Sequence, residues 1–188
     1  RSQGTLAIAP ERARLYQECE AKGVAITVMK GLGGGALLDA KRSPYGVALS
    51  VSQCIQYALT RPAVASVLVG CASEKEVREA VAHGRAGEED RDFAAALTKS
   101  PVFSLKGQCM YCNHCLPCPA QIDIAQVNKY LDLAELSGEI PATVRAHYAA
   151  LEKNAADCVA CGACEERCPF GVPVIERMGR AVERFRSR

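Results

Sequence analysis

Two short runs of cysteines are the part of this sequence best suited to chemistry, and they hold eight of its 11 cysteines. The first run reads Cys109-Met-Tyr-Cys112-Asn-His-Cys115-Leu-Pro-Cys118, and the second reads Cys158-Val-Ala-Cys161-Gly-Ala-Cys164-Glu-Glu-Arg-Cys168. Cysteines at every third position turn their sulfurs toward one small volume. Thiolates grouped in this way hold iron–sulfur clusters or zinc ions.

Both runs end in Cys-Pro, which indicates how two clusters would share the ligands. In two-cluster ferredoxins, the last cysteine of each run ligates the cluster of the other run. This pattern assigns Cys109, Cys112, Cys115 and Cys168 to one 4Fe–4S cluster, and Cys158, Cys161, Cys164 and Cys118 to the other. Two residues precede the last cysteine in the first run and three in the second. The exchange of Cys168 therefore has stronger support than that of Cys118.

Three other roles for the cysteines fit less well. Structural zinc uses two separated Cys-x-x-Cys pairs, so four cysteines within ten residues would leave sulfurs idle. Covalent haem requires His directly after Cys-x-x-Cys, where this chain has Asn113 and Leu116. A disulfide framework has little support because the available sequence shows no signal-peptide pattern.

Composition places the chain among ordinary globular proteins. It has 188 residues, 49% of them hydrophobic, and a formal net charge of +2. We therefore expect no membrane span, no nucleic-acid partner and a reducing, cytoplasmic location. The remaining cysteines, Cys19, Cys54 and Cys71, are predicted to be small buried hydrophobic residues. Because the sequence begins at Arg1 without Met, we expect further residues upstream.

The first hundred residues alternate helical and strand patterns. Helices are predicted at 10–22, 51–61 and 73–83, and buried strands at 24–29 and 63–69. This order predicts parallel strands joined by crossovers. The turn Gly31-Leu-Gly-Gly-Gly-Ala36 matches the dinucleotide pattern G-x-G-x-x-A, but positions 50–56 lack the acid that a Rossmann fold requires.

Three segments resemble the last quarter of an aldo/keto reductase. They are Gly23-Val-Ala-Ile-Thr-Val-Met-Lys-Gly-Leu-Gly-Gly-Gly35, Gln56-Tyr-Ala-Leu-Thr-Arg-Pro62 and Ser66-Val-Leu-Val-Gly70 with Ser73 and Glu79. A branch of that family carries a two-cluster extension, which residues 84–188 resemble. The resemblance implies the C-terminal fragment of a TIM (β/α)8 barrel, an α/β fold, followed by an all-α helical ferredoxin domain. It also implies that the N-terminal half of the barrel is missing.

The resemblance implies a nicotinamide cofactor, NAD(H) or NADP(H), at the ends of the two strands. The implied contacts are Met29, Lys30, Gly31, Leu32, Gly33, Gly70, Ser73 and Glu76. Two alternatives stay open: a tight turn with a solvated Lys30, and a helix-capping role for Ser73 and Glu76. No catalytic residue is assigned, because the family's Asp, Tyr, Lys and His belong to earlier strands.

The expected domains are a partial barrel at 1–83, a linker at 84–106 and a dicluster domain at 107–188. A short helix is predicted at 93–97 within the linker, and helices are predicted between the cysteine runs from Ile124 and from Pro141. The C-terminal residues 174–188 predict an amphipathic helix rich in arginine, either solvated or docking an acidic electron partner. His114 and His147 are not expected to be ligands.

Three functions remain at this stage. The first is an oxidoreductase that combines reductase-like chemistry with a two-cluster electron relay. The second is a plain electron-transfer module whose barrel remnant anchors it to an unidentified redox partner. In the third, the clusters only hold a small helical domain together.

Overall fold

A computed structural model describes residues 10–101, 106–136 and 138–186, which form two compact units. Among these residues, the first unit comprises 25–101 and the second comprises 10–24, 106–136 and 138–186. Helix α1 (Pro10–Ala21), placed by the sequence with the partial barrel, therefore groups with the cysteine runs. The two units are described separately below.

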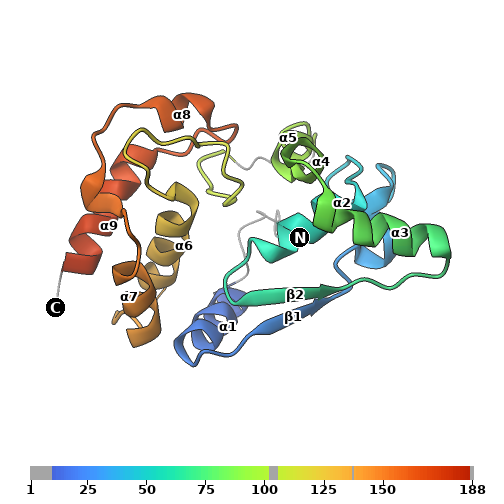
Figure 1. The fold of residues 1–188 in the computed structure, drawn as a ribbon, viewed down its shortest axis with the longest axis horizontal. Coiled ribbons are helices and arrows are strands. Elements are labelled where there is room, and N and C mark those ends of the chain that lie inside the picture. The colour runs from blue at the N-terminus through green and yellow to red at the C-terminus, as the bar shows by residue number, and fades with distance from the viewer. Residues whose placement is uncertain (1–9, 102–105, 137, 187–188) are drawn as a thin grey trace. The chain divides into compact units, whose positions relative to one another are not determined.

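The first unit contains a pair of parallel strands, as the order of elements predicted. Strand β1 (Ile26–Met29) pairs with β2 (Val64–Leu68), and α2 (Val51–Leu59) provides the crossover. Figure 1 shows α2 and α3 on one side of this strand pair. The hydroxyls of Thr27 and Ser66 lie 2.8 Å apart across the pair.

The prediction of a TIM-barrel fragment is wrong. Within the described residues, β1 and β2 are the only strands, they form one two-stranded sheet, and the remaining elements are helices. A strand, a crossover helix and a second parallel strand make up any βαβ unit. The local pattern that suggested a barrel therefore holds no information about closure.

The strands are also more exposed than predicted. Exposure alternates along β1 and varies along β2, with Met29 70% and Leu68 57% exposed. Strands of parallel sheets are usually buried on both faces. The β-branched residues that suggested burial here reflect the strand conformation itself.

Helices carry the core of the first unit. Ser50 begins α2 with the predicted capping box, in which its side chain and that of Gln53 each accept a backbone N–H. The rings of Tyr57 and Phe93 are nearly perpendicular in a T-shaped contact, with ring centroids 5.4 Å apart. The other helical elements of the first unit are η1 (Gly33–Leu38), α3 (Glu74–Ala82), η2 (His83–Arg85), α4 (Glu88–Arg91) and α5 (Phe93–Leu97).

The described part of the second unit is entirely helical, as predicted for the region that holds the cysteine runs. Its helices besides α1 are α6 (Ile124–Glu135), α7 (Ala142–Ala149), η3 (Ala155–Asp157), α8 (Ala163–Arg167) and α9 (Val174–Arg186). Buried Leu133, Ala134, Ile140 and Val144 form one cluster of its core. The Phe185 ring stacks on Tyr148 with centroids 3.8 Å apart, which fixes the end of α9.

The arginines of α9 lie mainly against α6. Arg177 pairs with Asp132, Arg180 pairs with Glu135, and Arg184 donates to the Ala134 carbonyl. Three of the arginines proposed for a docking face thus join two helices of the same unit.

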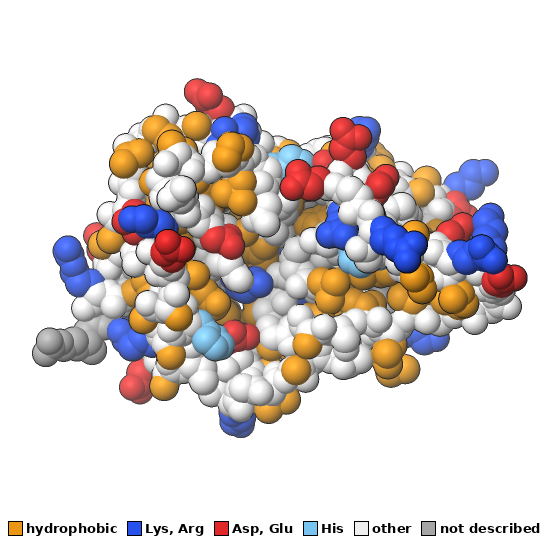
Figure 2. All heavy atoms as spheres, viewed as in Figure 1, with side chains coloured by type: hydrophobic (Ala, Val, Ile, Leu, Met, Phe, Trp, Pro, Cys, Tyr) orange, Lys and Arg blue, Asp and Glu red, His pale blue; other side chains and the backbone are white. Residues whose placement is uncertain are grey.

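No described helix has both the length and the apolar character needed to cross a membrane. On the face drawn in Figure 2, acidic and basic side chains are interspersed with hydrophobic ones. This mixture agrees with the small net charge.

Candidate metal centre

The first cysteine run lies in an irregular segment before α6. Tyr111, Asn113 and Gln121 have positive φ values of 56°, 67° and 58°, and the Leu116–Pro117 peptide is cis. Left-handed residues are unfavourable for side chains other than glycine and occur where the surrounding structure demands them. They lie in the segment that brings Cys109, Cys112 and Cys115 to one interior space.

Cys109, Cys112 and Cys115 line a hollow together with Cys168 of the other run. The hollow's remaining walls are mostly apolar and include Phe170 and Val172, which are 4% and 2% exposed. The structure therefore brings together the four cysteines that were grouped for the first cluster.

A second hollow gathers the other four cysteines. Cys158, Cys161 and Cys164 line it with Cys118, the last cysteine of the first run. The position of Cys118 agrees with its predicted exchange, which the cysteine spacing supported less strongly than that of Cys168. Ile124 and Val174 line both hollows, so the two spaces share part of a wall.

The cysteine groups do not resemble a site for a single metal ion. Among the described residues, no three His, Cys, Asp or Glu side chains form such a group. A single zinc ion needs its sulfurs about 2.3 Å from one point. A cluster of four irons binds each sulfur at a different corner, so its ligands are spread more widely. All eight cysteines are free of disulfides, and ligation itself stays a prediction.

Burial makes these thiols poor acids without a metal. It raises the pKa of Cys109 to about 12 and that of Cys115 to about 12, and it also raises the pKa of Cys164. An apolar site disfavours a thiolate unless a cation compensates for the lost hydration. Iron supplies that compensation, so the donor set and its surroundings fit 4Fe–4S clusters.

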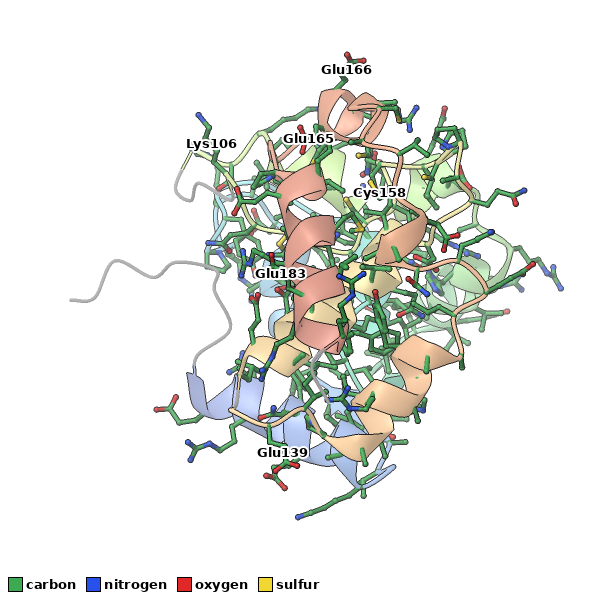
Figure 3. The ribbon with its side chains drawn as sticks, turned by 90° about the vertical axis from the view of Figure 1, so that its left-hand side faces the viewer. Lys106, Glu139, Cys158, Glu165, Glu166 and Glu183 are labelled. Carbon is green, nitrogen blue, oxygen red and sulfur yellow. The ribbon has the colours of Figure 1, made fainter. Side chains whose placement is uncertain are left out.

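Charged side chains of the second run bind the segments around it. Arg167 donates to the carbonyl oxygens of Cys115 and Pro117, at 2.7 and 2.6 Å, and so joins α8 to the first run. Glu165 accepts the Ile175 backbone N–H at the start of α9. Figure 3 shows Cys158, Glu165 and Glu166 toward one end of α9, with Glu139 toward the other.

A partly buried polar network adjoins the first hollow, and sequence reasoning did not find it. Asp132 accepts the Tyr111 hydroxyl with one carboxylate oxygen and the Arg177 guanidinium with the other. Arg177 also donates to the side chain of Asn128, which is fully buried. The sequence offered only the i, i+4 spacing of Asn128 and Asp132, which any helix face can show.

The other cysteines and histidines have varied surroundings. Cys54 is buried, which raises its pKa to about 11, and Cys19 is partly buried. Cys71 is exposed, so the prediction that it is buried is wrong: it follows β2 in an open loop. His114 lines the first hollow, and His147 Nδ1 lies 3.1 Å from Glu20 of α1.

Seven of the eight residues implied for a nicotinamide cofactor line one cavity of the first unit. The cavity measures about 660 Å³ and lies where β1 and β2 end. Its lining includes Met29, Lys30, Gly31, Leu32, Gly70, Ser73 and Glu76, whereas Gly33 is not part of it. The ends of parallel strands are where α/β proteins commonly bind ligands.

Some of these residues have structural roles. The Ser73 hydroxyl accepts the Glu76 N–H, and the Glu76 carboxylate accepts the Ala72 N–H at 2.6 Å, so both cap α3. A Cβ on Gly31 would lie 2.9 Å from Val67 Cγ1. Packing alone therefore accounts for glycine at position 31.

The 4Fe-4S dicluster domain model matches residues 108–175, which span both cysteine runs. No curated protein and no solved structure gave a match to the chain. The comparisons give no support to the resemblance to aldo/keto reductases. The chain thus carries a ferredoxin-like iron–sulfur domain, an electron-transfer module with two 4Fe–4S clusters.

Proposed function

We propose that this chain transfers single electrons through two 4Fe–4S clusters, each held by three cysteines of one run and the last cysteine of the other. The observation that supports this most directly is the arrangement of eight sulfurs around two hollows, four to each. When bound, each cluster supplies one-electron redox chemistry. The protein supplies the thiolates and an apolar wall that limits access of water.

The shared wall supports electron exchange between the clusters. Because Ile124 and Val174 face both hollows, the clusters would be separated by a thin layer of side chains. Cys161 is exposed and the adjacent Val159 is 65% exposed, whereas Cys109 is partly buried. Electrons would therefore enter or leave at the cluster of Cys158, Cys161 and Cys164, where a one-electron protein partner has access.

Metal and sulfide analysis tests this function directly. Purified under nitrogen, the chain should hold about eight irons and eight sulfides, and dithionite should bleach its visible absorption. Zinc without labile sulfide, or eight cysteines in disulfides, would contradict the proposal. Clusters that stay redox-silent in voltammetry would instead indicate a purely structural role.

A second candidate function concerns the cavity at the ends of β1 and β2. We propose that it binds a nicotinamide dinucleotide, which would give the chain hydride-based reductase chemistry in addition to electron transfer. Its volume of about 660 Å³ lies within the range of ligand sites, and Lys30 and Lys75 offer positive charge to phosphates. The capping roles of Ser73 and Glu76 favour the alternative in which these two residues only stabilise α3.

Calorimetry with NADH and NADPH separates the two candidates. If the cavity binds a dinucleotide, Lys30→Ala should weaken binding, while Lys41→Ala, an exposed lysine outside the cavity lining, should leave it unchanged. The absence of binding to the iron-loaded chain would leave electron transfer as the function. Equal losses in the two variants would indicate nonspecific attraction.

A further inference from the structure

The partly buried network beside the first hollow contains an ion pair that the electron-transfer function does not yet use. Arg177 of α9 and Asp132 of α6 bind each other through Nη2 and Oδ1, with the Arg177 side chain 11% exposed and Asp132 36% exposed. Tyr111 connects the pair to the cysteine run, since it lies between Cys109 and Cys112 and donates to Asp132 at 2.6 Å.

Two side chains of the network also line the first hollow. Tyr111 lines it and donates to Asp132, and Asn128 lines it and accepts from Arg177. Each charge is therefore one hydrogen bond away from the wall of the space that would hold the cluster. A partly buried site screens such charges less than water does.

Reduction makes the cluster one unit more negative, so nearby charges change its reduction equilibrium. One electron from a low-potential donor enters the cluster, and no bond forms or breaks. The positive charge of Arg177 favours the reduced cluster, and the negative charge of Asp132 favours the oxidised one. Because the two are paired, their effects oppose each other.

We propose that Asp132 and Arg177 each act on the reduction potential of the cluster held by Cys109, Cys112, Cys115 and Cys168, in opposite directions, so that their pairing keeps this potential near the value it would have with neither charge. This inference rests on the proposed electron-transfer function. A unit charge about 10 Å away changes a one-electron equilibrium roughly tenfold at an effective dielectric constant of about 20. Tenfold corresponds to about 59 mV for one electron.

The chain offers a matched control one helical turn further along. Arg180 pairs with Glu135 across the same two helices, three residues beyond Arg177 and Asp132 respectively. The Arg180 and Glu135 side chains, 44% and 32% exposed, do not line either hollow. The control pair therefore has the same chemistry and helices without the connection to the cysteine run.

Redox titration of the iron-loaded chain, followed by electron paramagnetic resonance, tests the proposal. Arg177→Gln should lower the potential of one cluster by about 59 mV or more, and Asp132→Asn should raise the same cluster's potential by a similar amount. The double variant should return near the original value, and Arg177→Lys, which keeps the charge, should move it little. Arg180→Gln and Glu135→Gln should shift neither cluster.

Two results would overturn the inference. Unchanged potentials in Arg177→Gln and Asp132→Asn, or shifts of the same sign in both, would refute it while leaving two-cluster electron transfer intact. A wild-type chain without iron and sulfide would refute the proposed function as well. Asp132→Asn is nearly isosteric, so it tests the charge even if Arg177→Gln does not fold.

Discussion

Exchange of the last cysteines between the two runs predicts a specific pattern of losses in double variants. Cys168 belongs to the second run in sequence but lines the hollow of Cys109, Cys112 and Cys115. Cys118 belongs to the first run in sequence but lines the hollow of Cys158, Cys161 and Cys164. Replacing cysteines by alanine therefore distinguishes ligation by run from ligation across runs.

The expected iron content follows from four irons per cluster. Cys109→Ala with Cys168→Ala removes two ligands from one hollow, so about four of about eight irons should remain. Cys118→Ala with Cys168→Ala removes one ligand from each hollow, and the iron content should fall toward zero. If each run instead held its own cluster, Cys118 and Cys168 would again be ligands of different clusters, so this variant would not distinguish the two schemes. Cys109 and Cys168 would also be ligands of different clusters in that case, and their double variant would lose both.

The decisive comparison is therefore between two double variants that each remove Cys168. Under exchange, Cys109→Ala/Cys168→Ala keeps one cluster, and Cys158→Ala/Cys168→Ala loses both. Iron and sulfide per chain, with the spectrum of the dithionite-reduced protein, measure the outcome. Cys71→Ala, outside the runs and exposed, serves as the control with both clusters intact. The reverse order, with the Cys158/Cys168 variant keeping one cluster, would refute the exchange.

Three further predictions concern stability and pH. Leu131→Ala, at a fully buried position of α6, should lower the free energy of unfolding by about 3 kcal/mol in urea, and a loss under about 1 kcal/mol would contradict its core role. Ser50→Ala should lower the free energy of unfolding in urea by about 1 kcal/mol, because it removes the side-chain cap of α2. Burial and Arg91 lower the pKa of His83 below its usual 6.5. The unfolded chain therefore binds the proton first as pH falls, so stability should decline below about pH 6.5, and His83→Gln should flatten that decline in pH-dependent thermal melts.

Local signals in the sequence predicted the elements well. Phe93–Leu97 is helical as predicted, and α6 begins at Ile124 where the apolar spacing begins. Ser50 supplies the cap that its Gln53 partner indicated. Capping, proline placement and helical periodicity depend on residues within one or two helical turns of each other, so they can be recognised in the sequence alone. The grouping of cysteines is predictable for the same reason, because three of four ligands lie within seven residues.

Features that depend on distant residues were missed or misread. Barrel closure requires strands that a two-strand segment does not specify, and the observed sheet ends at β1 and β2 within the described residues. Arg177 and Asp132 are 45 residues apart, and each has an ordinary helical context. The arginine pattern of α9 was visible, but only the position of α6 shows that these side chains face a neighbouring helix.

Helix α1 shows most clearly why the domain boundary could not be located from composition. Gln17 is 7% exposed and donates to the Leu133 carbonyl, which lies 116 residues away in α6. His147 of α7 contacts Glu20 of α1. In sequence, the first unit is thus inserted between two segments that both belong to the second unit. A fragment beginning at residue 106 would lose the donor to Leu133. Leaving that buried carbonyl without its partner costs about 1–3 kcal/mol, so the helical frame around the cysteines depends on residues far before the first run.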